Sequence, residues 1–404
     1  MRVVIQTLGT RGDVQPYVAL GVGLQARGHQ VTLATVAEFE GLAQSYGLPF
    51  APLRGDFLKA AQSAEGRANP LKLMREFVVM ARDTLDDEWH TAQGAEVYIY
   101  NSAALGGEHI AERLGVPSFA AFPAPLYTPT SAFPNPFFPF GQLGPFNRLS
   151  HQLLARMGPA MYGRPIRDWR REVLGLPPAR GEVKVNGRPI PLLYGYSEAV
   201  VPRPTDWPGH VLVAGYWLLD SPAAWQPPAE LTAFLEAGPP PVYIGFGSMY
   251  MAGGAKTTSV VVQALRQAGL RAVVATGWGG LTSDQANDHL LFIQEAPHAW
   301  LFPRVAAVVH HGGAGTTGAG LRAGRPTLVC PQIGDQLFWG RRVAALGAGP
   351  APLPRGQLTA ERLAAALRTL TTDAVMRERA AELGARLQAE DGVARAVDFI
   401  EQLQ

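Results

Sequence analysis

The chain has 404 residues, of which 47% are hydrophobic and 17% charged, and its formal net charge is +2. This length predicts two domains of a globular protein, and the near-neutral charge argues against nucleic-acid binding. The single cysteine, Cys330, excludes an intramolecular disulfide and a cysteine-based zinc site. A strand pattern from the first residues leaves no room for a signal peptide, and no apolar run approaches the roughly 20 residues of a transmembrane helix. We therefore predict a cytoplasmic enzyme, for which peripheral contact with a membrane surface stays open.

Strand and helix patterns alternate along the first half of the chain, which predicts a parallel, doubly wound sheet. The strands are expected at Val3–Gln6, Gln30–Ala34, Glu96–Tyr100 and Ser118–Phe122, and the helices at Val14–Arg27, Glu38–Ser45 and Gly107–Leu114. The segment Phe119–Phe146 is dense in Pro and Phe, which excludes regular helix and central strand. We expect it to form a long ordered loop or the wall of an apolar site.

A second alternating half is predicted to begin near Val211, after a Pro-rich join. Its strands are expected at Val242–Gly245, Arg271–Thr276, Leu290–Ile293, Val305–Val309 and Pro326–Val329, and its helices at Thr258–Ala268, Thr317–Ala323, Gln336–Ala345, Thr359–Thr371 and Ala374–Gln402. We divide the chain into a Rossmann-like domain (1–205), a linker (206–228), a second Rossmann-like domain (229–385) and a C-terminal helix (386–404) that packs back on the first domain. The two α/β domains are expected to face each other across a cleft.

A glycine-rich run, His310-His311-Gly312-Gly313-Ala314-Gly315-Thr316-Thr317, joins an apolar strand to the start of a helix. Such a turn exposes backbone N–H groups at the positive end of a helix dipole, which predicts a phosphate or pyrophosphate site. The two imidazoles add donors that are either cationic or neutral. Because neighbours in a strand point to opposite faces, no more than one of them is expected to reach the ligand.

The same run contains a G-x-G-x-x-G pattern, Gly313–Gly318, which fits the dinucleotide fingerprint. An NAD site would need an acid at the end of the next strand, but the apolar run Pro326–Pro331 is followed there by Gln332, and Asp335 lies beyond Gly334. Both NAD and other pyrophosphate ligands would bind such glycines, so the glycines alone do not distinguish them. The paired histidines and Asp335-Gln336 are the features that argue against NAD. An NAD-dependent oxidoreductase and a non-catalytic nucleotide-sugar sensor are kept as alternatives.

Two parts of the chain resemble one enzyme family. The segment from Glu295 to Gly349 is similar to the nucleotide-sugar signature of the GT-B glycosyltransferases of the UDP-glycosyltransferase superfamily (family 1), through Pro297-His298, Leu301-Phe302-Pro303, the His310–Thr316 run and Gly334-Asp335-Gln336. The run Gly9-Thr10-Arg11-Gly12-Asp13-Val14-Gln15-Pro16 resembles the opening motif of the sterol glucosyltransferase and glycopeptide/macrolide glycosyltransferase branch. The resemblance implies a GT-B fold that holds a nucleotide sugar in the C-terminal half and the acceptor in the N-terminal half.

The resemblance also assigns expected roles by position. The diphosphate would meet His310, His311, Gly312, Gly313, Ala314, Gly315, Thr316 and Thr317. The phosphate or sugar end would meet Gly12 and Ser248, and the base would meet Trp278, Pro297 and His298. Carboxylate and amide groups pair well with adjacent hydroxyls, so the sugar would be held by Asp335 and Gln336. A lipophilic acceptor such as a sterol, macrolide or other aglycone would contact Phe122, Phe133, Phe137 and Phe138.

Asp13 is the candidate general base. It follows a glycine turn directly after the first strand, at the carboxyl edge where α/β sheets place ligands. A carboxylate there could remove the acceptor proton, a contribution of about 10²–10⁴-fold in rate. The alternative is that Asp13 caps the helix at Val14, and the residue could do both. An acid needs a desolvated pocket to serve as a base, which sequence does not show.

The remaining expectations concern the donor. The resemblance implies an inverting single displacement with a UDP-sugar, such as UDP-glucose, or a dTDP-sugar as donor substrate. No D-x-D metal motif appears, since Asp86-Asp87-Glu88 is interpreted as a solvated helix face, so no metal or other cofactor is expected. Many relatives carry a ribose-binding Glu eight positions after the first histidine, where this chain has Gly318. The choice between UDP and dTDP therefore stays open.

Overall fold

The first half of the chain is built on a seven-stranded parallel sheet with strand order β3-β2-β1-β4-β5-β8-β9. The computed structural model describes residues 1–55, 70–179, 181–247, 254–276 and 288–403. The strands of this sheet are β1 (Arg2–Gln6), β2 (Gln30–Thr35), β3 (Phe50–Pro52), β4 (Val97–Tyr100), β5 (Ser118–Phe122), β8 (Leu192–Tyr194) and β9 (Val211–Val213). The side chains of β4 and β5 are buried on both faces, as expected for the centre of a parallel sheet covered by helices.

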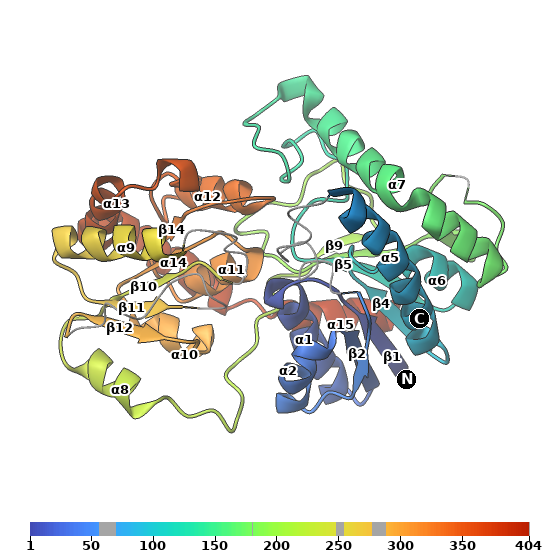
Figure 1. Cartoon of the computed structure of the whole chain (residues 1–404), viewed down its shortest axis with the longest axis horizontal. Coiled ribbons are helices and arrows are strands. Elements are labelled where there is room, and N and C mark those ends of the chain that lie inside the picture. Colours follow the sequence, from blue (N-terminus) through green and yellow to red (C-terminus); the bar gives the residue numbers. More distant parts are fainter. Residues whose placement is uncertain (56–69, 180, 248–253, 277–287, 404) are drawn as a thin grey trace.

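Helices cover both faces of this sheet, as Figure 1 shows. They are α1 (Arg11–Ala26), η1 (Ala37–Phe39), α2 (Glu40–Ser45), α5 (Pro70–Ala92), α6 (Gly107–Leu114), η2 (Gly144–Phe146) and α7 (Asn147–Glu172), where η denotes a 3₁₀ helix. A small antiparallel hairpin, β6 (Lys184–Val185) and β7 (Arg188–Pro189), precedes β8. Helix α7 lies alongside α5, and its N-terminal end with the loop before it projects at the top of the view (Figure 1).

The second half contains a five-stranded parallel sheet with strand order β12-β11-β10-β13-β14. Its strands are β10 (Val242–Gly245), β11 (Ala272–Ala275), β12 (Leu290–Ile293), β13 (Ala307–His310) and β14 (Thr327–Val329). Its helices are α8 (Ala229–Glu236), α9 (Gly254–Ala268), α10 (His298–Leu301), η3 (Phe302–Arg304), α11 (Ala314–Arg322), α12 (Gln336–Ala345), η4 (Arg355–Gln357), α13 (Ala360–Thr372) and α14 (Ala374–Gln388). The sheets belong to two Rossmann-like domains.

The chain passes between the domains twice. It leaves the first sheet after β9 and returns after α14, so that the last helix, α15 (Gly392–Gln402), packs on α1 of the first domain (Figure 1). Arg27, the C-cap of α1, donates to Asp398 of α15 at 2.6 Å, an exposed contact between this helix and the first domain. The two crossing segments touch backbone to backbone, since a Cβ on Gly392 would lie 2.5 Å from the carbonyl carbon of Gly215.

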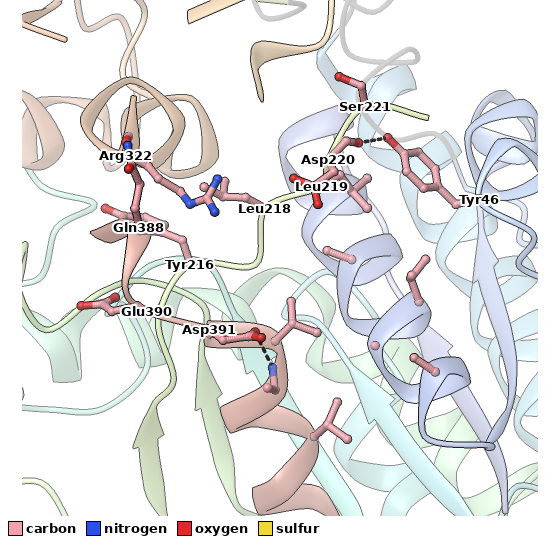
Figure 2. Close-up of a pocket in the computed structure, with 18 of the residues that line it drawn as sticks. Tyr46, Tyr216, Leu218, Leu219, Asp220, Ser221, Arg322, Gln388, Glu390 and Asp391 are labelled. Carbon is pink, nitrogen blue, oxygen red and sulfur yellow. Dashed lines mark hydrogen bonds between the residues drawn. The ribbon is translucent and has the colours of Figure 1, made fainter. Parts of the chain in front are cut away.

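A pocket of about 840 Å³ lies at this junction. Figure 2 shows Tyr46, Tyr216, Arg322 and Glu390 around it, contributed by both domains and by the crossing segments. The Tyr46 hydroxyl donates to the backbone oxygen of Asp220 at 2.6 Å across one side. None of the site residues predicted from sequence lines this pocket, so it is a feature of the junction rather than of the site.

The structure corrects several element predictions. Val211–Val213 is the last strand of the first sheet and does not open the second half. Phe119–Phe122, where the predicted strand and the predicted Pro/Phe-rich loop overlap, belongs to the central strand β5, so that the loop begins later than predicted. The predicted helix Ala374–Gln402 is two helices, because the chain turns between domains at residues 389–391. Three strands, Val242–Gly245, Leu290–Ile293 and Ser118–Phe122, match their predicted bounds. In the described part of the chain, no helix combines the length and apolarity needed to cross a membrane.

Candidate active site between the two domains

The turn between β1 and α1 holds Asp13 through its neighbour Thr10. Helix α1 begins at Arg11, three residues earlier than predicted, so Asp13 lies in the first turn and Thr10 is the N-cap. The Thr10 backbone N–H donates to Asp13 Oδ2 at 2.8 Å, and the Thr10 hydroxyl donates to the same oxygen at 3.0 Å. Among the described residues, no hydrogen bond ends on Oδ1. The capping role therefore engages one carboxylate oxygen and leaves the other for a ligand.

Burial raises the pKa of Asp13 above its ordinary value, while the backbone and side-chain hydrogen bonds from Thr10 lower it. Desolvation disfavours the charged carboxylate and so makes it a stronger proton acceptor than an exposed one. The sequence did not show whether Asp13 is desolvated. In the structure it is half-buried, with an environment that favours proton uptake.

The glycine-rich turn after β13 places two histidines differently. His310 ends the strand and is fully buried, and its Nδ1 accepts a 2.9 Å bond from the Gly312 N–H, which leaves the proton on Nε2. His311 follows the strand and is half-buried, with its ring perpendicular to that of His310 at 6.0 Å between centroids. His310 Nε2 and His311 Nδ1 are buried atoms without a hydrogen-bond partner in the described structure. Of the two side chains, His310 is inaccessible to solvent and His311 is partly exposed.

Both histidines are neutral near physiological pH. Burial lowers the pKa of His311 to about 4, and burial together with the neighbouring histidines lowers the pKa of His310 well below its ordinary value. Of the two forms that the sequence left open, the structure therefore favours the neutral imidazole. Neutral donors contribute less to anion binding than charged ones.

The N-terminus of α11 supplies the remaining donors. Gly313 is the N-cap, and the backbone N–H groups of Ala314, Gly315 and Thr316 form the first helical turn, which has no intrahelical acceptors for them. Thr317 is different, because its N–H and its hydroxyl both donate to the Gly313 oxygen, each at 2.9 Å. The N–H and the hydroxyl of Thr317 are therefore engaged within the turn, whereas no hydrogen bond described in the structure uses the three preceding amides.

Asp335 and Gln336 begin α12 next to this turn. Asp335 Oδ2 accepts a 2.7 Å bond from the Trp339 indole N–H one turn further along the helix. The pKa of Asp335 is raised to about 6, mainly by burial and also by the charge of Asp13. The hydrogen bond from Trp339 acts in the opposite direction. Gln336 is buried, and its Oε1 accepts bonds from the Gln332 and Ile333 N–H groups at 2.8 and 3.2 Å. Its predicted sugar contact is thereby limited to the amide nitrogen, because the oxygen holds the preceding loop.

The two domains meet around these groups. Arg11 of α1 forms an ion pair with Glu295, which follows β12 of the other domain. The charge of Asp13 raises the pKa of Asp335, and the charges of both acids raise the pKa of Tyr127 after burial. The carboxyl edges of the two sheets therefore face one space, with Asp13 on one side and Asp335 and the α11 N-terminus on the other.

The predicted base-binding residues lie at the same edge. His298 begins α10 after Pro297, its ring stacks on Phe302 at 4.2 Å between centroids, and it meets the edge of Tyr243 at 5.9 Å. Burial, together with the charges of Arg11 and His311, lowers the pKa of His298 to about 3. His298 is thus part of an aromatic group beside His311. Ser248 and Trp278 lie outside the described residues.

The four phenylalanines predicted as an acceptor wall do not form a single surface. Phe122 is buried, Phe133 is half-buried against Phe338 of the other domain at 5.6 Å between centroids, and Phe138 contacts the exposed Phe137 edge-on. Only Phe133 reaches across to the second domain at α12.

Sequence reasoning missed three residues of this site. Arg11 lies inside the quoted opening motif, and its position one turn before Gln15 on α1 could have been inferred. Trp339 lies four residues after Asp335, a spacing that brings side chains together on a helix. Tyr127, whose ring lies 4.3 Å from that of Phe122, comes from the irregular Pro-rich segment, where no periodic signal places it.

Packing explains why position 318 carries a glycine. A Cβ at this position would lie 2.5 Å from Cδ1 of Tyr216, whose ring occupies the space beside α11. Tyr216 belongs to the first crossing segment between the domains. The chain therefore holds an aromatic ring from the junction where many relatives would extend a glutamate.

The acidic run Asp86-Asp87-Glu88 is not a solvated helix face. Asp86 accepts a 2.8 Å bond from the Trp169 indole, Asp87 is bonded by Arg54 at 2.8 Å, and Glu88 is fully buried. Glu88 accepts the Gly106 N–H at 2.6 Å before α6, and burial raises its pKa to about 8. These acids hold the fold together. The described residues include no group of three or more His, Cys, Asp and Glu that could hold a metal ion.

Comparison with known proteins agrees with this geometry. Residues 3–134 match the glycosyltransferase family 28 N-terminal domain, and residues 283–403 match the C-terminal domain of proteins like erythromycin biosynthesis protein CIII. The first match contains the turn that carries Asp13, and the second contains the turns that carry His310, His311 and Asp335.

Curated relatives cover nearly the whole chain. It is 38% identical to sterol 3-beta-glucosyltransferase UGT80B1 of Arabidopsis thaliana, over 98% of this chain and 67% of that protein. It is 37% identical to a sterol 3-beta-glucosyltransferase of Neosartorya fischeri over 99% of this chain, but spans only 29% of that protein's length. The chain belongs to the GT-B glycosyltransferases of the UDP-glycosyltransferase superfamily. Within them it falls in the sterol glucosyltransferase and macrolide glycosyltransferase branch.

Solved structures share the fold. The glycotransferase of kitacinnamycin matches with a TM-score of 0.72 at 22% identity, over 100% of this chain and 98% of that one. The Streptomyces sp. SF2575 glycosyltransferase SsfS6, complexed with thymidine diphosphate, matches with a TM-score of 0.66 at 20% identity, over 100% and 99%. Both cover the two domains together.

Proposed function

We propose that this chain transfers a hexosyl group from a nucleotide sugar to a hydroxyl of a lipophilic acceptor, with inversion at the anomeric carbon. The observation that carries the proposal is the pair of carboxylates on opposite domains. Asp13 lies in the first turn of α1 and Asp335 at the N-cap of α12, on two domains that the ion pair of Arg11 and Glu295 joins, and the charge of Asp13 raises the pKa of Asp335. A hydroxyl acceptor beside the first and a sugar beside the second would meet there.

Asp13 acts as the general base in this proposal. Its Oδ1 takes the proton of the acceptor hydroxyl while that oxygen attacks the anomeric carbon. The bond from this carbon to the phosphate oxygen breaks at the same time, and the nucleoside diphosphate leaves with the electron pair. Because Thr10 bonds only Oδ2 among the described contacts, Oδ1 can take the proton without breaking the cap.

The leaving diphosphate is stabilised by the α11 N-terminus. The amides of Ala314, Gly315 and Thr316 are oriented by the helix before any reaction, so they need no reorganisation as charge develops. His311 adds a donor, and an anion beside it favours its protonated form. Arg11 brings a guanidinium to the same edge, where it contacts Glu295.

Asp335 holds the sugar hydroxyls. Its pKa of about 6 leaves it mainly ionised at neutral pH, and a carboxylate accepts stronger hydrogen bonds from hydroxyls than a neutral group does. We assign UDP-glucose as the donor because the relatives are named glucosyltransferases. The SsfS6 complex with thymidine diphosphate makes a dTDP-sugar the alternative to test.

The NAD alternative receives no support from the topology. A dinucleotide fingerprint follows the first strand of its α/β half, whereas Gly313–Gly318 follows β13, the fourth strand of the second sheet in chain order. Asp335, the acid nearest in sequence to the next strand, begins α12 and bonds Trp339.

The test is a matrix of UDP- and dTDP-sugars against sterol, macrolide and flavonoid acceptors, with products detected by mass spectrometry. We expect a product heavier by one hexosyl unit from UDP-glucose and at least one lipophilic acceptor, and none without acceptor. Binding of UDP-glucose without transfer to any acceptor and without hydrolysis would instead indicate a sensor. Quenching of protein fluorescence by NADH but not by UDP would support an oxidoreductase.

A further inference from the structure

The N-terminal end of α7 exposes apolar side chains. Among the described residues nine large apolar side chains are exposed, and six of them lie between Tyr127 and Leu153. Phe146, Leu149 and Leu153 are 64%, 54% and 51% exposed, and their spacing places them on one face of the helix. With Phe137 and Phe140 of the preceding loop they form what we call the α7 apolar surface.

The same helical segment buries three of its polar residues on the opposite side. Asn147, Ser150 and His151 are at most 6% exposed. They hold the preceding loop: Asn147 donates to the Ser131 oxygen at 2.8 Å, the Ser150 hydroxyl accepts the Asn135 N–H at 2.7 Å, and His151 Nε2 lies 3.2 Å from the Phe133 oxygen. The solvent-facing side of this segment therefore carries large apolar side chains among exposed polar ones, Arg148, Gln152 and Arg156. Exposed apolar surface of this kind marks an interaction site.

Charge indicates what the surface meets. From Arg113 to Arg167 the sequence contains no Asp or Glu, whereas it contains Arg148, Arg156 and Arg164. Arg148 and Arg156 are exposed beside the apolar face, and Arg148 lies 3.9 Å from Asp206. Aromatic and leucine side chains flanked by arginines match the boundary of an anionic bilayer, where apolar groups enter the acyl region and guanidinium groups meet phosphates.

The position in the fold agrees with this partner. The N-terminal end of α7 and its loop project beyond the rest of both domains (Figure 1). The loop is also tied to the catalytic side, because Arg341 of α12 donates to the Phe140 oxygen and, at 3.0 Å, to the Pro139 oxygen. Phe133 of the same segment contacts Phe338 of α12. The α7 apolar surface is therefore continuous with the edge of the candidate acceptor region.

We propose that the α7 apolar surface docks the enzyme on an anionic lipid bilayer, with Phe146, Leu149 and Leu153 inserted and Arg148 and Arg156 on the phosphates. The docking itself does not depend on the reaction. That a lipophilic acceptor then passes from the bilayer along the Phe137–Phe138–Phe140 group to the cleft rests on the proposed function.

Docking is tested by sedimentation of the full chain with two kinds of vesicle, one of phosphatidylcholine and one of phosphatidylcholine with phosphatidylglycerol. The wild type is expected to bind the anionic vesicles. Replacing Phe146, Leu149 and Leu153 together by Gln should weaken binding by at least tenfold. Arg156→Gln should weaken binding to the anionic vesicles about fivefold and leave binding to neutral ones unchanged.

The matched control removes exposed apolar side chains elsewhere. Val375→Gln with Leu403→Gln, which are 57% and 46% exposed in the wild type, should bind vesicles like the wild type. All variants should keep the wild-type melting temperature, because the replaced side chains face solvent. Wild-type protein that stays in the supernatant with both vesicles would overturn the proposal, as would full binding by the triple variant. Self-association of the wild type that the triple variant loses, without vesicle binding, would identify a protein interface instead.

Discussion

Asp13 and Asp335 are held by different neighbours, and the difference separates their tasks. Asp13 accepts two bonds from Thr10 on Oδ2, which fix the carboxylate at the start of α1. Asp335 accepts the Trp339 indole on α12 and is affected by the charge of Asp13. Burial raises the pKa of both acids. The first is suited to take a proton, and the second to accept hydrogen bonds while ionised.

The pKa of Asp335 predicts a pH dependence of donor binding. Because this pKa is about 6, Asp335 is ionised above that pH and protonated below it. The affinity for UDP-glucose should therefore fall about tenfold as pH is lowered from about 8 to about 5, since a charge-assisted hydrogen bond is lost. Calorimetric titrations of the wild type and of Asp335→Asn across this range measure the effect.

Asp335→Asn is the matched variant, because its amide oxygen can still accept the Trp339 bond. Asp335→Asn should bind UDP-glucose weakly at every pH and lose most of the pH dependence of this affinity. Protonation of His311, whose pKa is about 4, would strengthen diphosphate binding at low pH in both proteins, so the difference between them isolates Asp335. Equal pH profiles would remove Asp335 from the sugar site.

At the scale of elements, two short turns form most of the site, and both could be predicted from sequence. The runs Gly9–Pro16 and His310–Thr317 each follow an apolar strand, so their place at the carboxyl edge of a sheet follows from local pattern. The start of α11 at Ala314 could not be predicted as well, because its glycines gave no helical period. The bonds that engage Thr317 and Gln336 depend on loop geometry, which no residue pattern specifies.

The β1–α1 turn predicts the effect of a glycine substitution. Gly9 has φ of +132°, and a Cβ there would lie 2.4 Å from Asp13 Oδ2. Gly9→Ala should displace the carboxylate and reduce turnover at least tenfold, with stability lowered by about 1–3 kcal/mol. Steady-state rates and thermal unfolding measure the two effects.

Gly28→Ala is the control, because it strains the backbone without displacing the Asp13 carboxylate. Gly28 has φ of +85°, and a Cβ there would have no heavy atom within 4 Å. This variant should lose about 1–2 kcal/mol of stability and keep the wild-type rate. If both variants lost the same fraction of turnover, backbone strain rather than the position of Asp13 would explain the result.

At the scale of the whole molecule, contacts between domains set the distance between the two acids. Arg342 of α12 donates to the Val200 oxygen through Nε at 2.9 Å and through a terminal nitrogen at 2.6 Å, and Arg341 bonds the Pro139 oxygen. The exposed pair of Arg11 and Glu295 contributes at most about 1 kcal/mol to this arrangement. Helix α12, which begins beside Asp335, is thereby fixed against the first domain.

These contacts explain what the sequence could not predict. The two-domain α/β architecture follows from alternating strand and helix patterns, and the glycosyltransferase fold from the two motifs together. The sequence could not predict that β8 and β9 belong to the first sheet, because strands of three residues show no periodicity. The break between α14 and α15 and the facing of Asp13 and Asp335 result from the return of the chain across the junction, which only the assembled domains define.

The central claim is that Asp13 activates the acceptor across from the bound nucleotide sugar. It is tested most directly by the rate of hexosyl transfer by Asp13→Asn, measured beside its affinity for the same nucleotide sugar. The asparagine oxygen can still accept the Thr10 bonds, so the turn is preserved. If Asp13 is the base, this variant is expected to have a rate lower by about 10²–10⁴-fold and an unchanged donor affinity. A rate near that of the wild type would contradict it.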